Sequence, residues 1–226
     1  MRLPHKTIER RLFRDGYRFV IGVDEVGMGC LAGPVVVCAV ALSPDFPHIA
    51  GIRDSKLLSK KQRETLAFEL KKRKIRFQIS LCYPRTIDKI NIYQAARKAM
   101  RRAIARLATP LDPPYLKGGS KNSSPLEARG AGGVVVLVDG PHKISGLNLP
   151  QLAIIKGDRT VFAIACASVI AKVHRDRMMV RYAKRFPQYG FERHKGYGTK
   201  LHVAMLTRYG PTAIHRRSFV PVGQVI

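Results

Sequence analysis

The sequence contains no tryptophan and has little negative charge, with 15 Asp and Glu against 41 Lys and Arg among its 226 residues. The formal net charge is therefore +26 at pH 7. Such an excess favours a polyanionic partner, because phosphate groups gain from the positive field and release counterions on binding. We predict that this partner is a nucleic acid. The charge alone is also compatible with a surface of solvated lysines or with a ribosomal-type protein.

The sequence also lacks closely paired cysteines and long apolar runs. Its four cysteines form no C-x-x-C pair and no metal-binding spacing: Cys30, Cys38, Cys82 and Cys166. This pattern indicates reduced thiols and a cytoplasmic protein. Residues 1–6 begin with charge and contain no apolar leader segment. No window approaches the roughly 18 apolar residues that cross a bilayer, so we expect no membrane contact.

Five segments have the apolar content of strands. Residues 18–24 and 34–42 are expected to form the first two, joined by a tight return through glycines. Residues 74–83 alternate apolar and polar side chains, which predicts a half-buried third strand. Residues 134–138 and 152–155 are short apolar runs next to glycine. Together they predict an α/β fold with a mixed five-stranded sheet flanked by helices.

Helices are predicted between these strands and after them. Ser59 and Gln62 have the spacing of a capping box, which predicts a helix from there to about residue 72. Apolar periodicity predicts further helices at about 86–107, 160–185 and 201–208. We expect one domain over residues 1–226, with a C-terminal helical part at about 186–226. Residues 108–133 are rich in Pro, Gly and Ser, which predicts a flexible insertion.

The acidic residues are few, and several stand beside glycine at the expected strand ends. Asp24 and Glu25 follow the first apolar run, Asp139 precedes Gly140, and Asp158 follows a glycine. Adjacent strand residues point to opposite faces, so Asp24 and Glu25 can share a site only if the strand ends or bulges there. Four carboxylates favour Mg²⁺ or Mn²⁺ over zinc, and in a basic protein they suit two-metal hydrolysis. Alternatively, these acids cap helices, pair with Arg and Lys, or form Asp-Gly turns.

Six ordered motifs carry a family resemblance. They are Asp24-Glu25-x-Gly-x-Gly-x-Leu-Ala-Gly-Pro, Asp54-Ser55-Lys56, Val138-Asp139-Gly140, Lys156-Gly157-Asp158, Ala167-Ser168-x-x-Ala171-Lys172-x-x-Arg175-Asp176-Arg177 and the seven residues 194–200. In this order and spacing the chain resembles bacterial ribonuclease HII. The resemblance implies an RNase H-like fold that cleaves the RNA strand of RNA–DNA hybrids and incises 5′ of single ribonucleotides in duplex DNA. It also implies that the catalytic, metal-binding acids are Asp24, Glu25, Asp139 and Asp158.

The resemblance further implies substrate contacts. Gly27, Met28 and Gly29 match the loop that grips the ribose 2′-OH through main-chain groups, a close approach that glycine permits. The family usually has arginine followed by proline where this chain has Met28 and Cys30, so we expect altered affinity or junction preference. Tyr197 resembles the tyrosine that stacks on the sugar; otherwise it is an ordinary turn residue. Four further residues resemble backbone-phosphate contacts: Ser55, Lys56, Ser168 and Lys172.

Three alternatives remain at this stage. His194, His202 and His215 are candidate ligands, but their spacing fits no zinc site and we expect solvated positions. Ribonuclease HIII shares the opening acids and tolerates a residue other than arginine between the glycines, but we find no counterpart of its extra N-terminal domain. A non-catalytic nucleic-acid-binding protein on the same fold is less expected, because all four acids are present. We expect a monomer that acts on RNA–DNA hybrid and ribonucleotide-containing duplex DNA.

Overall fold

A mixed sheet with the strand order β3-β2-β1-β4-β5 forms the centre of the computed structural model, which describes residues 3–109, 111 and 133–225. β1 pairs antiparallel with β2, and β2 with β3, whereas β1–β4 and β4–β5 are parallel pairs. The predicted five-stranded mixed sheet is thus confirmed. Its strands are β1 (Phe19–Val26), β2 (Val35–Leu42), β3 (Arg76–Cys82), β4 (Val134–Asp139) and β5 (Gln151–Ile154).

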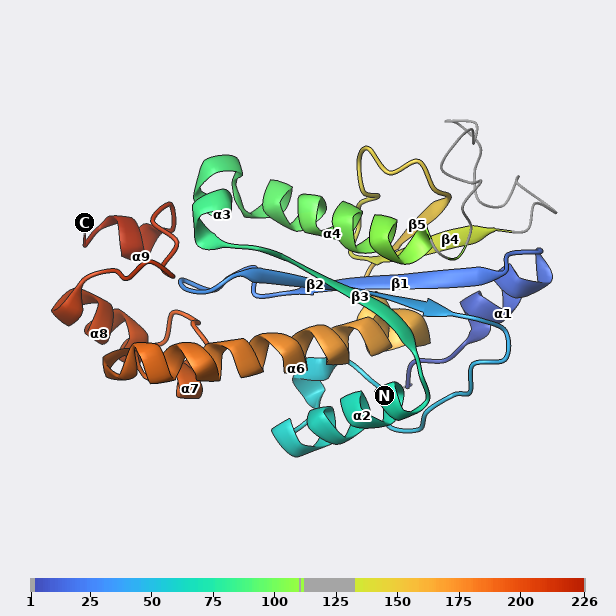
Figure 1. Cartoon of the computed structure of the whole chain (residues 1–226), viewed down its shortest axis with the longest axis horizontal. Coiled ribbons are helices and arrows are strands. Elements are labelled where there is room, and N and C mark those ends of the chain that lie inside the picture. The colour runs from blue at the N-terminus through green and yellow to red at the C-terminus, as the bar shows by residue number, and fades with distance from the viewer. Residues whose placement is uncertain (1–2, 110, 112–132, 226) are drawn as a thin grey trace.

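Helices cover both faces of this sheet (Figure 1). α4 (Ile92–Ala108) lies on one face, and α6 (Phe162–Arg185) runs along the other with α2 (Lys60–Lys72). All eight residues of β2 are buried, as its unbroken apolar run predicts for a strand covered on both sides. Each face therefore has its own apolar cluster, one beneath α4 and one beneath α6.

α6 packs unusually close to β1, because small residues meet at the contact. A Cβ atom at Gly22 would lie 2.3 Å from the carbonyl carbon of Ala163, so only glycine fits there. α1 (Thr7–Arg14), which the sequence did not predict, supports the start of α6. The Glu9 carboxylate accepts a hydrogen bond of 2.9 Å from the Ala163 N–H, whereas the N-cap residue Val161 supplies no side-chain cap. The N-terminal segment thereby fixes the helix that carries several predicted site residues.

Two long helices predicted from periodicity are each divided. The expected helix at 86–107 is α3 (Pro84–Ile90) followed by α4, with a break at Asn91, whose φ is +61°. The Asn91 side chain caps α4 by accepting a hydrogen bond of 3.0 Å from the Gln94 N–H. The expected helix at 160–185 begins as a separate turn, α5 (Gly157–Thr160), before α6. The predicted Ser59–Gln62 capping box at the start of α2 is confirmed.

Short elements complete the described part of the chain. The last helices, α7 (Phe191–His194), α8 (Lys200–Tyr209) and α9 (Val220–Gly223), lie beyond the end of the sheet where α6 projects (Figure 1). Two single turns of 3₁₀ helix are η1 (Ser55–Leu57) and η3 (Pro187–Tyr189). Most of the predicted insertion at 108–133 lies outside the described residues. Among the described helices none is long and apolar enough to cross a membrane.

Candidate active site

The parallel pairing of β1 with β4 brings the predicted acids to one region of the sheet. Val23 lies opposite Val138, so the next residues along the two strands are Asp24 and Asp139. The expectation that β1 ends or bulges at its acids is wrong, because β1 continues to Val26 in one-to-one register with β2. Asp24 and Glu25 therefore point to opposite faces. Glu25 and Asp139, the last residue of β4, line one cavity of about 280 Å³ that Asp24 does not line, and the charges of both act on the buried Asp24.

The four acids act on one another electrostatically. Burial, and then the charges of Glu25 and Asp139, hold the pKa of Asp24 well above its usual value. Burial, followed by the charge of Asp139, raises the pKa of Glu25 to about 7 against the opposing effect of Lys56. Asp158 contributes to both shifts, and its own pKa is raised to about 6 by burial and then by Asp139. The four carboxyl groups thus form one repulsive cluster.

Local backbone contacts hold two of these carboxylates. Asp139 Oδ1 accepts a hydrogen bond of 2.7 Å from the Gly157 N–H, and Asp24 Oδ1 accepts one of 2.7 Å from the Glu25 N–H. A side chain at residue 157 would meet Ile164 at 2.5 Å, so glycine permits this approach. Asp158 does not lie at a strand end as predicted; it is in the first turn of α5, directly after this glycine.

The donor chemistry of the cluster fits a hard divalent cation. All four predicted ligands are carboxylates, which suit Mg²⁺ or Mn²⁺, and bound positive charge would offset the burial and the repulsion that raise the pKa values of Asp24, Glu25 and Asp158. Within the described residues, no three His, Cys, Asp or Glu side chains already form a ready-made metal cluster. The set therefore fits in chemical type, and its side chains would have to rearrange to close a ligand shell.

The predicted recognition residues lie beside one another. Cys30 and Tyr197 form an isolated antiparallel bridge, so the Gly27–Gly29 loop and the loop of Tyr197 are adjacent. Tyr197 is 39% exposed, and the Lys172 ammonium lies 5.8 Å from the centroid of its ring. Met28 packs against the apolar cluster beneath α4 and lines the same cavity as Glu25 and Asp139. An exposed aromatic face, a glycine-rich backbone and the acids are thus neighbours.

The four predicted phosphate contacts have different surroundings. Ser55 and Ser168 are buried and joined by a hydroxyl–hydroxyl hydrogen bond of 2.9 Å, and Ser168 also acts on Asp24 to lower its pKa. Lys56 is exposed and lowers the pKa of Glu25 and Asp158, so its charge faces the acidic cluster. Lys172 is already paired with Asp176 at 2.8 Å. Lys56 is therefore the freer cation for an incoming phosphate.

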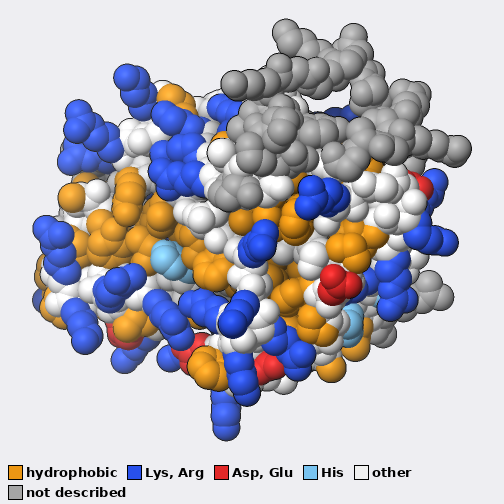
Figure 2. Space-filling view, turned by 45° about the vertical axis from the view of Figure 1, so that its right-hand side comes forward, with side chains coloured by type: hydrophobic (Ala, Val, Ile, Leu, Met, Phe, Trp, Pro, Cys, Tyr) orange, Lys and Arg blue, Asp and Glu red, His pale blue; other side chains and the backbone are white. Residues whose placement is uncertain are grey.

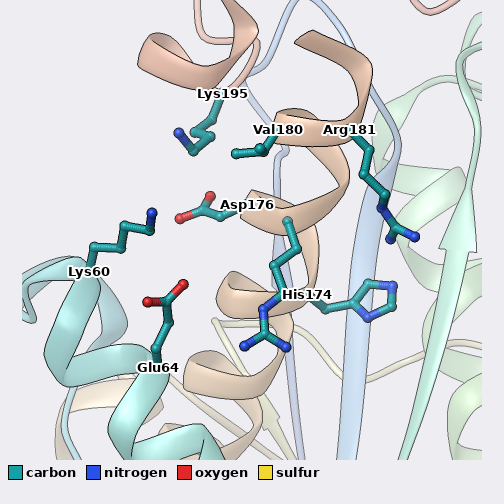
Figure 3. A pocket seen from close by; sticks show the side chains of 8 residues that line it. Lys60, Glu64, His174, Asp176, Val180, Arg181 and Lys195 are labelled. Atoms are coloured by element: carbon teal, nitrogen blue, oxygen red, sulfur yellow. The ribbon is translucent and has the colours of Figure 1, made fainter. Parts of the chain in front are cut away.

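A separate hollow of about 590 Å³ lies between α2 and α6 (Figure 3). Lys60 of α2 and Lys195 point toward Asp176 of α6 across it. The Asp176 carboxylate is compensated by Lys172 at 2.8 Å and by Arg63 at 3.6 Å. The hollow contains none of the four predicted acids and has a surplus of positive charge. Figure 2 likewise shows Lys and Arg spread over one face of the molecule, with few Asp and Glu between them.

The prediction of solvated histidines is wrong. His194, His202 and His215 are buried with exposures of 8%, 0% and 2%, and the rings of the first two stack at 4.4 Å. Burial lowers the pKa of His202 and of His215 to about 4, so both are neutral at pH 7. The Thr212 N–H donates to His215 Nδ1, which leaves Nε2–H of His215 to donate to His202 Nε2 at 3.1 Å. His202 Nδ1–H then donates to the Tyr197 carbonyl at 2.9 Å.

Sequence reasoning also assigned no role to two buried arginines, Arg175 and Arg216. Both are fully buried and contact the main chain of residues 27–34. Burial lowers the pKa of Arg216 to about 10, so the guanidinium stays charged at neutral pH. Arg175 lies in one of the six motifs and Arg216 in none, but a basic residue within a basic sequence gives no sign that it will be buried.

The chain matches a family model, curated relatives and solved structures of known proteins. A family model described as "Ribonuclease HII" matches residues 21–222. The ribonuclease HII of Caldicellulosiruptor saccharolyticus is 44% identical over 213 residues, covering 94% of this chain and 92% of that protein. The solved PCNA:RNase HII complex from Archaeoglobus fulgidus matches with a TM-score of 0.67 at 26% identity, over 89% of this chain and 95% of that one. Bst-RNase HIII in complex with Mn²⁺ has a TM-score of 0.68 at 16% identity, over 95% and 71%, and so shows the fold alone.

Proposed function

This chain belongs to the ribonuclease HII family and is an endoribonuclease of the ribonuclease H type, and we propose that it has two related activities. It hydrolyses the RNA strand of RNA–DNA hybrids, and it incises duplex DNA on the 5′ side of single ribonucleotides. The family model and the curated relatives favour ribonuclease HII over ribonuclease HIII and over a non-catalytic binding protein.

The observation that carries this proposal is the cluster of four mutually repelling carboxylates beside a recognition surface. Asp24, Glu25, Asp139 and Asp158 would hold the catalytic cations. When bound there, Mg²⁺ or Mn²⁺ would supply an activated water and charge stabilisation for the leaving oxygen. The four acids provide the hard oxygen donors that these cations prefer.

The protein's own groups prepare the cluster for that role. The Gly157 N–H orients Asp139 by donating to its carboxylate. The Asp24 carboxylate accepts a hydrogen bond from the Glu25 N–H and also interacts with the Ser168 side chain. Glu25, with a pKa of about 7, carries a proton in part of the molecules at neutral pH. That proton must leave before the carboxylate can bind a cation, so cation binding and proton release are coupled.

The substrate would be held by charge, by an aromatic face and by main-chain groups. A net charge of +26 supports binding of the phosphate backbone of either strand. Tyr197 offers an exposed ring on which a sugar can pack, and the Gly27–Gly29 loop beside it would distinguish ribose from deoxyribose through the 2′-OH. Recognition by the main chain requires no particular side chain at Met28. We further propose that the protein acts as a monomer.

The decisive experiment uses a DNA duplex that carries one ribonucleotide, in Mg²⁺, in Mn²⁺ and in EDTA. We expect one cut on the 5′ side of the ribonucleotide with either cation and none in EDTA. An otherwise identical all-DNA duplex is the control and should remain intact. A continuous RNA–DNA hybrid should be cut at many positions. Cutting of the all-DNA duplex, or cutting in EDTA, would contradict the proposal.

A further inference from the structure

Arg216 is fully buried, and within the described residues it forms no ion pair. Its guanidinium instead donates to three main-chain carbonyls of residues 27–33, which we call the recognition loop. Nη2 donates to Gly27 O at 2.7 Å, Nη1 to Met28 O at 2.9 Å and Nε to Gly33 O at 3.0 Å. The loop is therefore tied to one planar donor group from the C-terminal part of the chain.

Arg175 of α6 makes a second set of contacts with the same stretch. It donates to Ala32 O at 3.0 Å, to Pro34 O at 3.1 Å and to Lys195 O at 2.9 Å. It also lies directly behind the loop, since a Cβ at Gly27 would be 2.3 Å from Arg175 Nε. We call Arg175 and Arg216 the arginine clamp. Together they bond to five carbonyls between residues 27 and 34.

A buried charge is costly unless it is paired, and apolar packing of the same volume is commonly as stable. Two clamping arginines without a carboxylate partner are therefore poorly explained by stability alone. What an apolar residue could not do is fix the direction of several carbonyl groups at once. A guanidinium has five N–H donors in a rigid plane and is suited to that task.

The direction of the carbonyls sets the direction of the amides. Every described peptide bond is trans, so each carbonyl and the N–H that follows it point in opposite directions. Because Gly27 O and Met28 O point inward at Arg216, the N–H groups of Met28 and Gly29 point away from it. Neither N–H has a partner in the described part of the chain, whereas those of Leu31 and Gly33 donate to Gly196 O and Ile214 O.

We propose that Arg175 and Arg216 are positioning residues that turn residues 27–29 into a hydrogen-bond donor surface for the 2′-oxygen of the substrate. The inference rests on the proposed function, which already gives ribose recognition to the main chain of this loop, and it adds the two arginines that orient the amides of Met28 and Gly29. The side chain at residue 28 takes no part in it. Tyr197 completes the surface, because its loop is bonded to both the clamp and the recognition loop.

The main test replaces Arg216 with Lys, which keeps a positive charge but has one nitrogen in place of the three that bond to the separate carbonyls. Dissociation constants are measured in EDTA for a duplex with one ribonucleotide and for the matched all-DNA duplex. We expect the ratio of the two constants to fall about tenfold, as two lost hydrogen bonds would produce. Affinity for the all-DNA duplex should change less than about twofold, since it rests on surface charge. A ratio equal to that of the unaltered protein would overturn the proposal.

The ratio of the two dissociation constants distinguishes a positioning role from a simple loss of folded protein. Unfolded molecules lower the apparent affinity for both duplexes equally and so leave the ratio unchanged. Leu12→Ala is the matched control, because Leu12 is buried in α1 and belongs to the apolar cluster beneath α6. This variant should lower the melting temperature and leave the ratio unchanged. A fall in the ratio for Leu12→Ala as well would mean that the effect follows stability, and would also overturn the proposal.

A second measurement uses the unaltered protein and so does not depend on folding of a variant. Amide hydrogen exchange of Met28 and Gly29, followed by NMR, should be fast in the free protein. It should slow on binding the ribonucleotide duplex and stay fast with the all-DNA duplex. Equal exchange with both duplexes would refute the donor surface. Cleavage by the unaltered protein is measured first, so that absent cleavage counts against the proposed function and not against the clamp alone.

Discussion

Replacement of Glu25 by Gln should stabilise the protein when no divalent cation is present. The pKa of Glu25 is raised from 4.5 to about 7, first by burial and then by Asp139. The folded state therefore holds this proton more tightly than the unfolded state, and unfolding releases it between about pH 4.5 and 7. Stability of the unaltered protein must fall as the pH rises through that window. The Glu25→Gln variant has an uncharged amide at this position and would escape the loss.

The size of the effect follows from the shift. About 2.5 pKa units correspond to about 3 kcal/mol of free energy of unfolding at pH 8, where Glu25 is ionised. For a chain of this length, about 3 kcal/mol raises the melting temperature by roughly 6–12 °C. At pH 4 the carboxyl is protonated in both states, and the variant should gain almost nothing. The gain should therefore appear between pH 4.5 and 7.

The gain in melting temperature is measured by thermal unfolding of both proteins in EDTA at pH 4 and pH 8, followed by circular dichroism. The control is Glu69→Gln, since Glu69 is a partly exposed carboxylate paired with Arg73 at 2.7 Å and should show no gain at either pH. Added Mg²⁺ should stabilise the unaltered protein more than the variant, and more at pH 8 than at pH 5.5, because protons compete for the carboxylates. If Glu25→Gln is no more stable than the unaltered protein at pH 8 in EDTA, the conclusion that burial and Asp139 raise the pKa of Glu25 is wrong.

Three further substitutions test the site. Asp139→Asn should abolish cleavage while the dissociation constant for a hybrid, measured in EDTA, stays within about threefold, because binding rests on surface charge; equal loss of both would indicate a folding role. Tyr197→Ala should lower the cleavage rate at a single ribonucleotide by about tenfold or more through lost positioning of the sugar, with all-DNA binding as the control. Met28→Arg should tighten substrate binding by about 0.5–3 kcal/mol if the guanidinium reaches a phosphate, and steepen the salt dependence by about one charge without moving the cut. A new ribonucleotide selectivity in Met28→Arg, absent from the parent, would contradict recognition by the main chain.

The sheet could be predicted because its signals are local. The apolar run of residues 35–42 needs no tertiary information to be recognised as a strand covered on both faces, and the Ser59–Gln62 capping box marks the start of α2 in four residues. The break at Asn91 could not be found this way. Apolar periodicity continues through it, and only the positive φ and the new cap reveal that two helices meet there.

The acids could be proposed as a site from their types, their neighbours and the family resemblance, but their arrangement could not. The alternation of a strand places Asp24 and Glu25 on opposite faces, and sequence alone suggested a bulge to reunite them. The structure instead keeps a regular strand, and β4 ends at Asp139 as its apolar run predicts. What cannot be read from the residues of β1 is its parallel pairing with β4, which sets Val138 opposite Val23 and so brings Asp139 to the level of Asp24.

Burial of polar residues was the least predictable feature. His202 was expected in solvent although it lies in a helix predicted from apolar periodicity, and Arg216 lies in a basic segment, and yet both are fully buried. Each forms hydrogen bonds with main-chain carbonyls or with a ring nitrogen of residues that are remote in sequence or belong to a different loop. The composition gives the number of basic residues, but it does not indicate which of them are buried and hydrogen-bonded in the interior.

The arginine clamp also gives a physical account of why residue 28 can depart from the usual family residue. Arg216 bonds to the carbonyls of Gly27 and Met28, which every residue type possesses, and Arg175 packs behind Gly27 where no side chain fits. The path of the loop is therefore set by its glycines and by the two arginines. A change at residue 28 alters what the loop adds to binding, such as a phosphate contact, and leaves the direction of its amides unchanged. Selectivity for ribose and overall affinity can then vary independently in this chain, because they depend on different atoms of the same three residues.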